Sequence, residues 1–409
     1  MIRPVPRLTQ LGWGLAIPVL VLAALGVASI HATDRSHPDP AAPPAAAGPV
    51  FDRNWSGLIV HAIGPLTLRQ LLYLTGGIGL LLVVLIPSYR RIGRYAYWAY
   101  GLVLALLLLL TVDRYVDLPL IPVKRDVRRW IELGPLSVQP SEFMKVALIL
   151  ALAYYLRYRD SYRRWWGLLP PFLLTLAPMV LILKQPDLGT LLMLLPVLFA
   201  MLFVAGARLR HLATIAGLGC AVLPLFYFFG MHDYQRQRFE VLFKQNVADE
   251  SWHMGPGYQL RQALIALGTG GLTGEGYGQG AFVRYNLLPE EHNDFIFAVI
   301  GNQWGLLGCC VVILAYVVIT ICGLEVATVT NDPFGRLLAV GVVVMIVAQA
   351  LLNICMTLGL APITGMTLPF VSFGGSSLWA NFLALGLLVN VAQRRPLLIA
   401  QPPFQHDDE

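Results

Sequence analysis

Hydrophobic residues in this chain gather in long continuous runs that are separated by short polar connections. The runs do not alternate with polar residues as a half-buried strand would. A hydrocarbon core about 30 Å thick is crossed by roughly 20 apolar residues in a helix. The pattern predicts an all-α polytopic membrane protein of about ten transmembrane helices, near residues 11–30, 67–87, 95–112, 143–157, 166–183, 188–205, 210–229, 294–322, 337–359 and 374–393.

The composition excludes several other classes of protein. Of the 409 residues, 57% are hydrophobic and 13% are charged. Such a chain is not intrinsically disordered, and its continuous runs differ from those of a disulfide-stapled secreted domain or a membrane β-barrel. The formal net charge is +6. In a membrane protein basic residues first report topology, so we do not predict nucleic-acid binding.

Arginines cluster beside predicted helix ends and predict the orientation. The clusters lie at 3–7, 90–94, 157–164, 208–210 and 394–395. The positive-inside rule therefore predicts that both termini are cytoplasmic. The expected organisation is an N-terminal transmembrane helix at 1–30, an extracytoplasmic loop at 31–66, helices 2–7 at 67–229, a large extracytoplasmic loop at 230–293, helices 8–10 at 294–395 and a cytoplasmic tail at 396–409.

The two outer loops differ in composition. The loop at 31–66 is rich in Pro and Ala, which is typical of an extended or flexible tether. The loop at 230–293 carries aromatic residues, charges and a run of glycines between Gly268 and Gly280. Loops of this length are usually functional or disordered, and the low Pro and Ser content argues against disorder.

Polar side chains at membrane depth are costly unless they are paired or face an aqueous cavity. Pro140 and Ser141 suit the start of the fourth helix, with Glu142 in its first turn. Glu142 and Lys145 are three residues apart and share one helix face. They are predicted either to neutralise each other or to shape an active cavity.

Two further polar segments interrupt the apolar pattern. Asp187, which follows Lys184, is predicted to cap the sixth helix. The Gly374–Ser377 segment contains Ser376 and Ser377 and precedes the tenth helix. Its backbone N–H groups could bind phosphate, whereas the same small residues also serve tight helix packing.

The boundary between the large outer loop and the eighth helix carries the most informative set of titratable residues. Glu290, Glu291, His292 and Asp294 precede an apolar run. A carboxylate there can act as a general base, or can bind a hard divalent cation together with Glu290 or Glu291. The alternative is that Asp294 caps the eighth helix.

These residues resemble the SEDS family of bacterial shape, elongation, division and sporulation proteins, and RodA more than FtsW. The likeness covers about residues 67–395 and keeps the ten-helix plan. It rests on five segments in the same order: Arg129–Ile131 with Gln139–Glu142, Lys184–Thr190, the glycine run leading to Leu288–Glu290, His292 with Asp294–Ala298, and Pro369–Ser377.

The resemblance implies a peptidoglycan glycosyltransferase that polymerises lipid II at the outer face of the bacterial cytoplasmic membrane for cell elongation and shape. It implies a class B penicillin-binding protein and other elongation-complex proteins as partners. Asp294 becomes the critical carboxylate, a base or a ligand of Mg²⁺ or Mn²⁺ with Glu290, and no organic cofactor is expected. Glu142 and Lys145 become the cavity pair, and the candidate substrate-binding residues are Arg129, Lys184, Asp187, His292, Ser376 and Ser377.

Two alternatives belong to other functional classes. A flippase for lipid-linked precursors would use the same polar cavity without forming a bond, and it predicts inverted repeats, of which the sequence shows no clear sign. A non-catalytic scaffold for a penicillin-binding protein would tolerate loss of Asp294. A ligase of the O-antigen type shares the topology and the kind of donor, but its outer loop is less similar.

Overall fold

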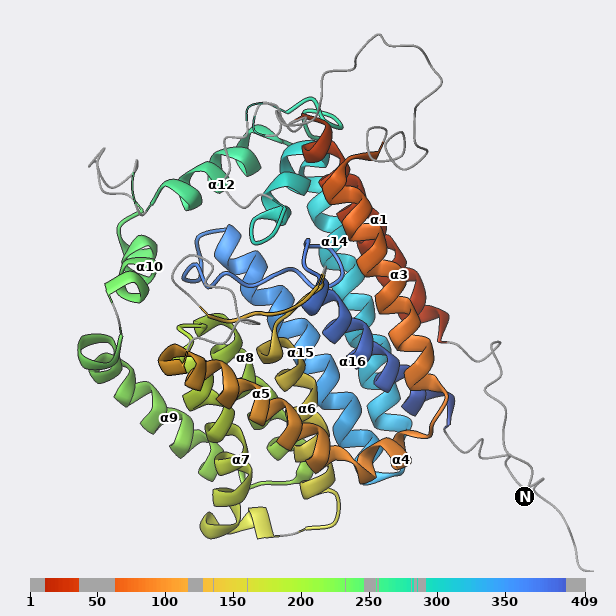
Figure 1. Cartoon of the computed structure of the whole chain (residues 1–409), viewed down its shortest axis with the longest axis vertical. Helices are drawn as coiled ribbons and strands as arrows, with labels where there is room; N and C mark the ends of the chain where they lie inside the picture. The colour runs from red at the N-terminus through yellow and green to blue at the C-terminus, as the bar shows by residue number, and fades with distance from the viewer. Residues whose placement is uncertain are drawn as a thin grey trace, which may run out of the picture.

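The computed structural model describes residues 12–36, 63–116, 128–134, 136–159, 161–231, 233–245, 255, 257–280, 282, 285 and 292–394. Within these ranges the chain is almost entirely helical (Figure 1). The helices are α1 Trp13–Ser36, α3 Pro65–Leu85, α4 Tyr89–Arg94, α5 Ala96–Val116, α6 Pro140–Leu156, α7 Trp165–Lys184, α8 Leu188–Ala205, α9 Leu209–Leu225, α10 Asp233–Phe243, α12 Tyr258–Thr269, α14 Ile296–Val329, α15 Pro333–Thr357 and α16 Gly375–Gln393. Short 3-10 and π turns occupy Ser161–Arg163 and Phe226–Gly230, and an antiparallel hairpin pairs β1 Ile131–Leu133 with β2 Leu136–Val138.

The predicted fold class is confirmed. Eight described helices are long and apolar enough to cross a membrane. The other two predicted spans correspond to α6 and α9, which have 17 residues each. The run expected at 294–322 is a longer helix, α14, of 34 residues. The hairpin and α4 were not expected, because segments of three to six residues carry too little periodicity to be recognised.

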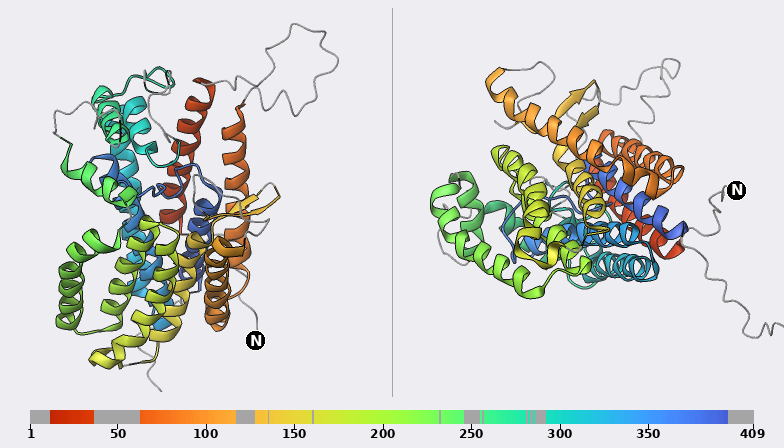
Figure 2. Two further views of the ribbon diagram at one scale, coloured as in Figure 1. Left: turned by 60° about the vertical axis from the view of Figure 1, so that its left-hand side comes forward. Right: turned by 90° about the horizontal axis from the view of Figure 1, so that it is seen from below.

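The core lies around α15 and α16, at the centre of the bundle (Figures 1 and 2). In the most apolar 18-residue stretch of each helix, the protein buries 67% of α15 and 78% of α16, against 28% of α3 and of α7. The outer helices therefore expose apolar faces that suit lipid, while the central pair is surrounded by protein.

Helix α14 is broken at Gly305, whose φ is +63° and ψ −157°. The glycine run between Gly268 and Gly280 packs against this break. The Leu306 amide donates to the carbonyl of Gly271 at 2.9 Å, and the Glu275 amide donates to the carbonyl of Asn302 at 2.9 Å. A Cβ at Gly274 would collide with the carbonyl of Gln303. The glycines thus allow two backbones to approach closely enough to pair the polar groups that the break frees.

The connection between α15 and α16 is non-helical and runs through the interior. Carbonyls at this depth need internal donors. Side chains from several helices supply them: Arg238 to Ile363, Asn353 to Met366, Gln349 to Thr367, Tyr316 to Pro369 and Gln70 to Ser372. The connection, residues 358–374, is therefore held in a fixed path and is called the inner loop below.

Candidate active site

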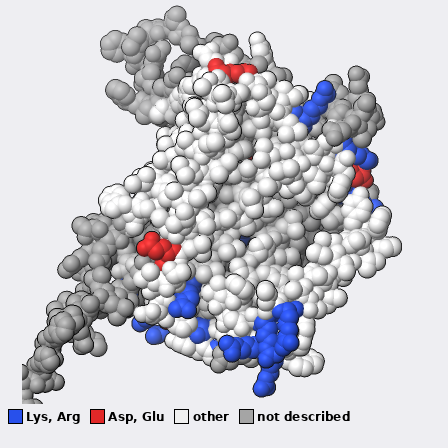
Figure 3. Space-filling view, turned by 180° about the vertical axis from the view of Figure 1, so that it is seen from behind, with Lys and Arg blue, Asp and Glu red and all other residues white. Residues whose placement is uncertain are grey.

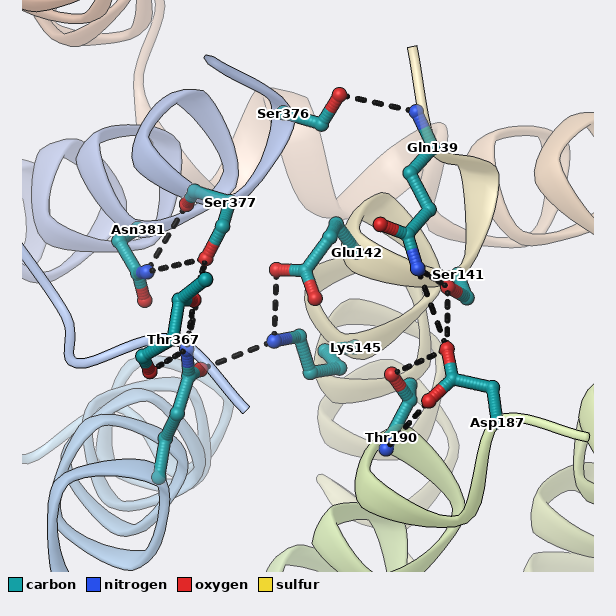
Figure 4. A network of polar contacts seen from close by, with 11 residues as sticks. Gln139, Ser141, Glu142, Lys145, Asp187, Thr190, Thr367, Ser376, Ser377 and Asn381 are labelled. Atoms are coloured by element: carbon teal, nitrogen blue, oxygen red, sulfur yellow. Dashed lines mark hydrogen bonds and ion pairs between the residues drawn. The ribbon is translucent and has the colours of Figure 1, made fainter. Parts of the chain in front are cut away.

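The Glu142–Lys145 pair lies on the first two turns of α6 and is buried (Figure 4). The Lys145 Nζ is 2.8 Å from Glu142 Oε2, and the residues are 2% and 6% exposed. Lys145 Nζ also donates to Gln349 Oε1 at 2.9 Å. The ammonium therefore contacts both its own helix and α15, which a pair that only eased membrane insertion would not require.

Gln349 extends this contact into the inner loop and α16. Its Nε2 donates to the Thr367 carbonyl at 2.9 Å, and the hydroxyl oxygens of Thr367 and Ser377 are 2.6 Å apart. Asn381 Nδ2 donates to the Ser377 carbonyl at 2.9 Å. One polar network thus joins α6, α15, the inner loop and α16 (Figure 4).

Asp187 caps α8, as predicted. Its Oδ1 accepts from the Thr190 amide at 3.2 Å, and its Oδ2 accepts from the Thr190 hydroxyl at 3.0 Å. The Oδ2 also accepts from the Ser141 hydroxyl and from Gln139 Nε2, each at 3.2 Å. The buried carboxylate ties α8 to the start of α6 and has the geometry of a structural residue.

Ser376 is separate from Ser377 in its contacts. Its hydroxyl accepts from the Gln139 amide at 2.9 Å and donates to the Ser137 carbonyl at 2.9 Å. Ser376 therefore fastens the β1–β2 hairpin and the start of α6 to α16, whereas Ser377 belongs to the Glu142–Lys145 network.

Arg129 and Lys184 lie on either side of the α7–α8 turn. Arg129 donates from Nε to the Gln185 carbonyl at 2.7 Å and from Nη2 to the Pro186 carbonyl at 2.6 Å. Lys184 is the last residue of α7 and is exposed. Arg129 holds the turn in place, and Lys184 forms no ion pair with a carboxylate in the part of the chain that the structure describes.

Asp294 is half-buried and precedes α14, where Phe295 occupies the N-cap position. The residue thus lies one position before the place of a capping side chain. Its carbonyl accepts from Asn353 Nδ2 at 2.8 Å. A Cβ built on Gly365 would lie 3.4 Å from Asp294 Oδ2 and 3.5 Å from Arg238 Nη1. A carboxylate and a guanidinium therefore flank the same bare stretch of inner-loop backbone.

His292, two residues before Asp294, contacts the inner loop. The His292 carbonyl accepts from the Phe373 amide at 2.9 Å, and the two rings meet edge-on with centroids 5.7 Å apart. Glu290 and Glu291, the proposed partners for a metal, lie outside the described residues. In the described ranges no group of three or more His, Cys, Asp or Glu residues could hold a metal ion.

Sequence reasoning missed two residues of α15, one of which contacts Lys145 and the other the backbone of Asp294. Gln349 and Asn353 are one turn apart on α15, both are fully buried, and they hold the adjacent carbonyls of Thr367 and Met366. Two amides four residues apart in an apolar span were the signal that could have revealed them. Arg238 gave no such signal, because basic residues are ordinary in a polar outer loop.

Comparison with known proteins gives a consistent result. The model of the family of cell cycle proteins FtsW, RodA and SpoVE matches residues 58–396. A probable peptidoglycan glycosyltransferase FtsW of Geobacter metallireducens is 36% identical over 80% of this chain and 84% of its own. The peptidoglycan glycosyltransferase MrdB of Escherichia coli K12 is 35% identical over 74% of this chain and 80% of its own.

Solved structures share the fold. One, described as structural coordination of polymerization and crosslinking by a peptidoglycan synthase complex, has a TM-score of 0.73 at 29% identity and covers 94% of this chain and 98% of that chain. The crystal structure of the rod shape determining protein RodA of Thermus thermophilus has a TM-score of 0.65 at 29% identity, with 94% and 97% covered. The chain therefore belongs to the FtsW, RodA and SpoVE family, and it is a multi-pass membrane protein and a peptidoglycan glycosyltransferase.

Proposed function

We propose that this protein polymerises lipid II into glycan strands at the outer face of the cytoplasmic membrane. The reaction joins the 4-hydroxyl of one disaccharide to the anomeric carbon of another, whose leaving group is a polyprenyl diphosphate. The proton passes from the hydroxyl to a base, and the diphosphate departs with the bonding electrons. We infer inversion at the anomeric carbon, since the donor already carries a good leaving group.

The position of Asp294 carries this proposal. Its carboxylate is half-buried at the boundary of the outer loop, beside Arg238 and against Gly365, which has no side chain. A general base must reach the hydroxyl that it deprotonates, and the absence of a side chain at Gly365 leaves backbone alone on this side of Asp294. Asp294 is assigned as the base and Arg238 as a neighbouring cation.

The leaving diphosphate requires donors near this carboxylate. Lys184, which is exposed at the end of α7, is the proposed donor, whereas Lys145 and Ser377 are already paired inside the buried network and are assigned to shaping the cavity. Arg129, Asp187 and Ser376 use their polar atoms in internal hydrogen bonds. They are assigned to positioning the α7–α8 turn and the hairpin, and His292 to anchoring the segment before Asp294.

We propose that a divalent cation binds at the same site. Mg²⁺ is commonly bound by one or two carboxylates together with substrate phosphates. Asp294 and Glu290 are the proposed protein ligands, and a bound Mg²⁺ or Mn²⁺ would neutralise charge on the diphosphate.

We assign the protein to cell elongation, with a class B penicillin-binding protein as its partner. Support comes from the RodA-like segments around Trp130 and 256–300, and from the fold shared with RodA and with the synthase complex. Sequence identity does not separate the two roles, because the FtsW relative is 36% identical to this chain and the MrdB relative is 35% identical. Depletion in the source bacterium separates the roles, because loss of an elongation enzyme gives round cells whereas loss of a division enzyme gives filaments.

The activity is tested with fluorescent lipid II, the purified protein and its class B partner, in the presence of moenomycin to silence classical transferases. Wild type is compared with Asp294→Asn, Arg238→Gln and Ser376→Ala, with Mg²⁺, Mn²⁺ or EDTA. We expect glycan ladders from wild type and Ser376→Ala, no ladder from Asp294→Asn, and a shortened ladder from Arg238→Gln.

Other outcomes would overturn parts of the proposal. Ladders from Asp294→Asn would exclude this carboxylate as the base. Movement of lipid II across liposome membranes by a well-folded complex that makes no ladder would favour a flippase. Full activity in EDTA would exclude a requirement for a divalent cation. A covalent glycosyl-enzyme intermediate would exclude direct displacement.

A further inference from the structure

A concave surface lies away from the candidate active site, where α7 and α9 begin. Both helices begin toward the end of the bundle that the sequence predicts to be cytoplasmic (Figure 1). It is a cavity of about 540 Å³. The residues that matter to its chemistry are Arg163, Arg164, Arg208, Arg210, Trp165 and His211.

Arg163 and Arg164 come from the connection between α6 and α7, Arg208 comes from the connection between α8 and α9, and Arg210 lies in the first turn of α9. All four are exposed, and none of them forms an ion pair with a carboxylate among the described residues. Figure 3 shows basic side chains gathered at this lower end of the molecule. Guanidinium groups bind phosphate through paired hydrogen bonds, so the cavity is suited to a phosphate-bearing anion.

His211 gives a second, independent observation. The residue is 5% exposed, and its ring lies against Trp165 with centroids 4.2 Å apart and the ring planes tilted by 33°. Its Nδ1 is buried and has no hydrogen-bond partner among the residues that the structure describes. Such a group in a native protein requires an explanation, and a bound ligand or ion is one of the common ones.

The cavity continues into a lipid-facing apolar stripe on α7. Trp165, Leu169 and Leu173 are four residues apart, and 50–53% of each is exposed. Residues with this spacing lie on one helix face. Tryptophans are enriched at the headgroup level of membranes, so the stripe runs from the interface toward the hydrocarbon core.

We propose that this cavity binds the headgroup of an anionic phospholipid. The phosphate lies among the four arginines, His211 hydrogen-bonds the headgroup, and an acyl chain follows the stripe on α7. Basic pockets between helices on the cytoplasmic side are known to suit such headgroups. The topological role of arginines explains their charge, but it does not explain the unpartnered His211 or the adjoining apolar stripe. The inference is independent of the catalytic proposal.

The test is native mass spectrometry of the full-length protein in detergent, titrated with phosphatidylglycerol, cardiolipin or phosphatidylcholine. Arg208→Gln/Arg210→Gln is compared with Arg91→Gln/Arg94→Gln, which removes the same charge from α4. We expect the cavity variant to bind the two anionic lipids about tenfold more weakly, and the α4 variant to bind them like wild type. Equal binding by the two variants would overturn the proposal.

Further variants keep the test decisive if loss of charge disturbs insertion. Arg208→Lys/Arg210→Lys keeps the charge and removes the paired guanidinium donors, and His211→Phe keeps the aromatic ring and removes Nδ1. Both are expected to weaken binding of the anionic lipids. Binding like wild type by both variants would contradict the assigned contacts, and complete displacement of the lipid by inorganic phosphate would identify a soluble anion as the ligand.

Discussion

Lys145 Nζ lies 2.8 Å from Glu142 Oε2, one helical turn away on α6, and both side chains are buried. Gln349 accepts a second hydrogen bond from the same ammonium. Removing one partner of a buried pair leaves an uncompensated charge, which costs more than the pair contributes. The pair is therefore a stability element whatever its part in substrate binding.

Glu142→Gln is expected to destabilise the protein by roughly 3–5 kcal/mol, because it leaves the Lys145 ammonium without its anion. The double variant Glu142→Gln/Lys145→Met should recover most of that loss. Thermal unfolding of wild type, Glu142→Gln, Lys145→Met and the double variant in the same detergent checks this. Additive losses in the double variant would show that the two charges are not coupled.

Asn353→Leu is expected to abolish polymerisation while the protein still folds. The substitution leaves the carbonyls of Asp294 and Met366 without their donor, and each unpaired buried group costs about 1–3 kcal/mol. Asn390→Leu is the matched control, since Asn390 is equally buried and donates to the carbonyls of Val84 and Pro87. Similar stability with activity only in the control is the expected result, and equal activity would contradict a positioning role for Asn353.

Gly274→Ala is expected to weaken the outer loop, because a Cβ there collides with the Gln303 carbonyl and φ is +84°. Gly79→Ala is its control, since nothing lies within 4 Å of the added carbon and alanine favours a helix by about 0.5–1 kcal/mol. Limited proteolysis should cut the Gly274 variant faster within the loop and leave the Gly79 variant unchanged. Equal cleavage would show that the close approach is not needed.

Asp187→Asn separates a capping role from a substrate-binding role. Asparagine caps a helix nearly as well as aspartate, whereas alanine costs about 0.5–2 kcal/mol. If Asp187 has only a structural role, the Asn variant keeps its activity and loses less stability than the Ala variant, because it keeps the acceptor for the Thr190 amide but places an NH2 group against Gln139 Nε2. Unfolding temperatures and lipid II polymerisation distinguish these cases, and an inactive but stable Asn variant would point to contact with substrate.

The helices could be predicted because each membrane crossing is a continuous apolar run, and the fold class follows from that signal alone. The cap at Asp187 and the pair at Glu142 and Lys145 follow from local spacing. The inner loop could not be foreseen, since its path depends on donors contributed by Tyr316, Gln70 and Gln349, which are far apart in sequence.

The break in α14 escaped sequence reasoning for a related reason. Gly301 and Gly305 lie in an apolar run, and glycine is common in membrane helices. Only the docking of the glycine run against residues 302–307 explains the non-helical backbone. Contact between two backbone segments that are far apart in sequence leaves no periodic pattern in either segment.

Because of that break, residues 296–304 form a short helical segment of their own before Gly305. The amides of Glu275 and Gly276 donate to the carbonyls of Asn302 and Gln303 and couple the outer loop to this segment, and Asp294 lies two residues before it. We infer that a movement of the outer loop would reach Asp294 through this short segment.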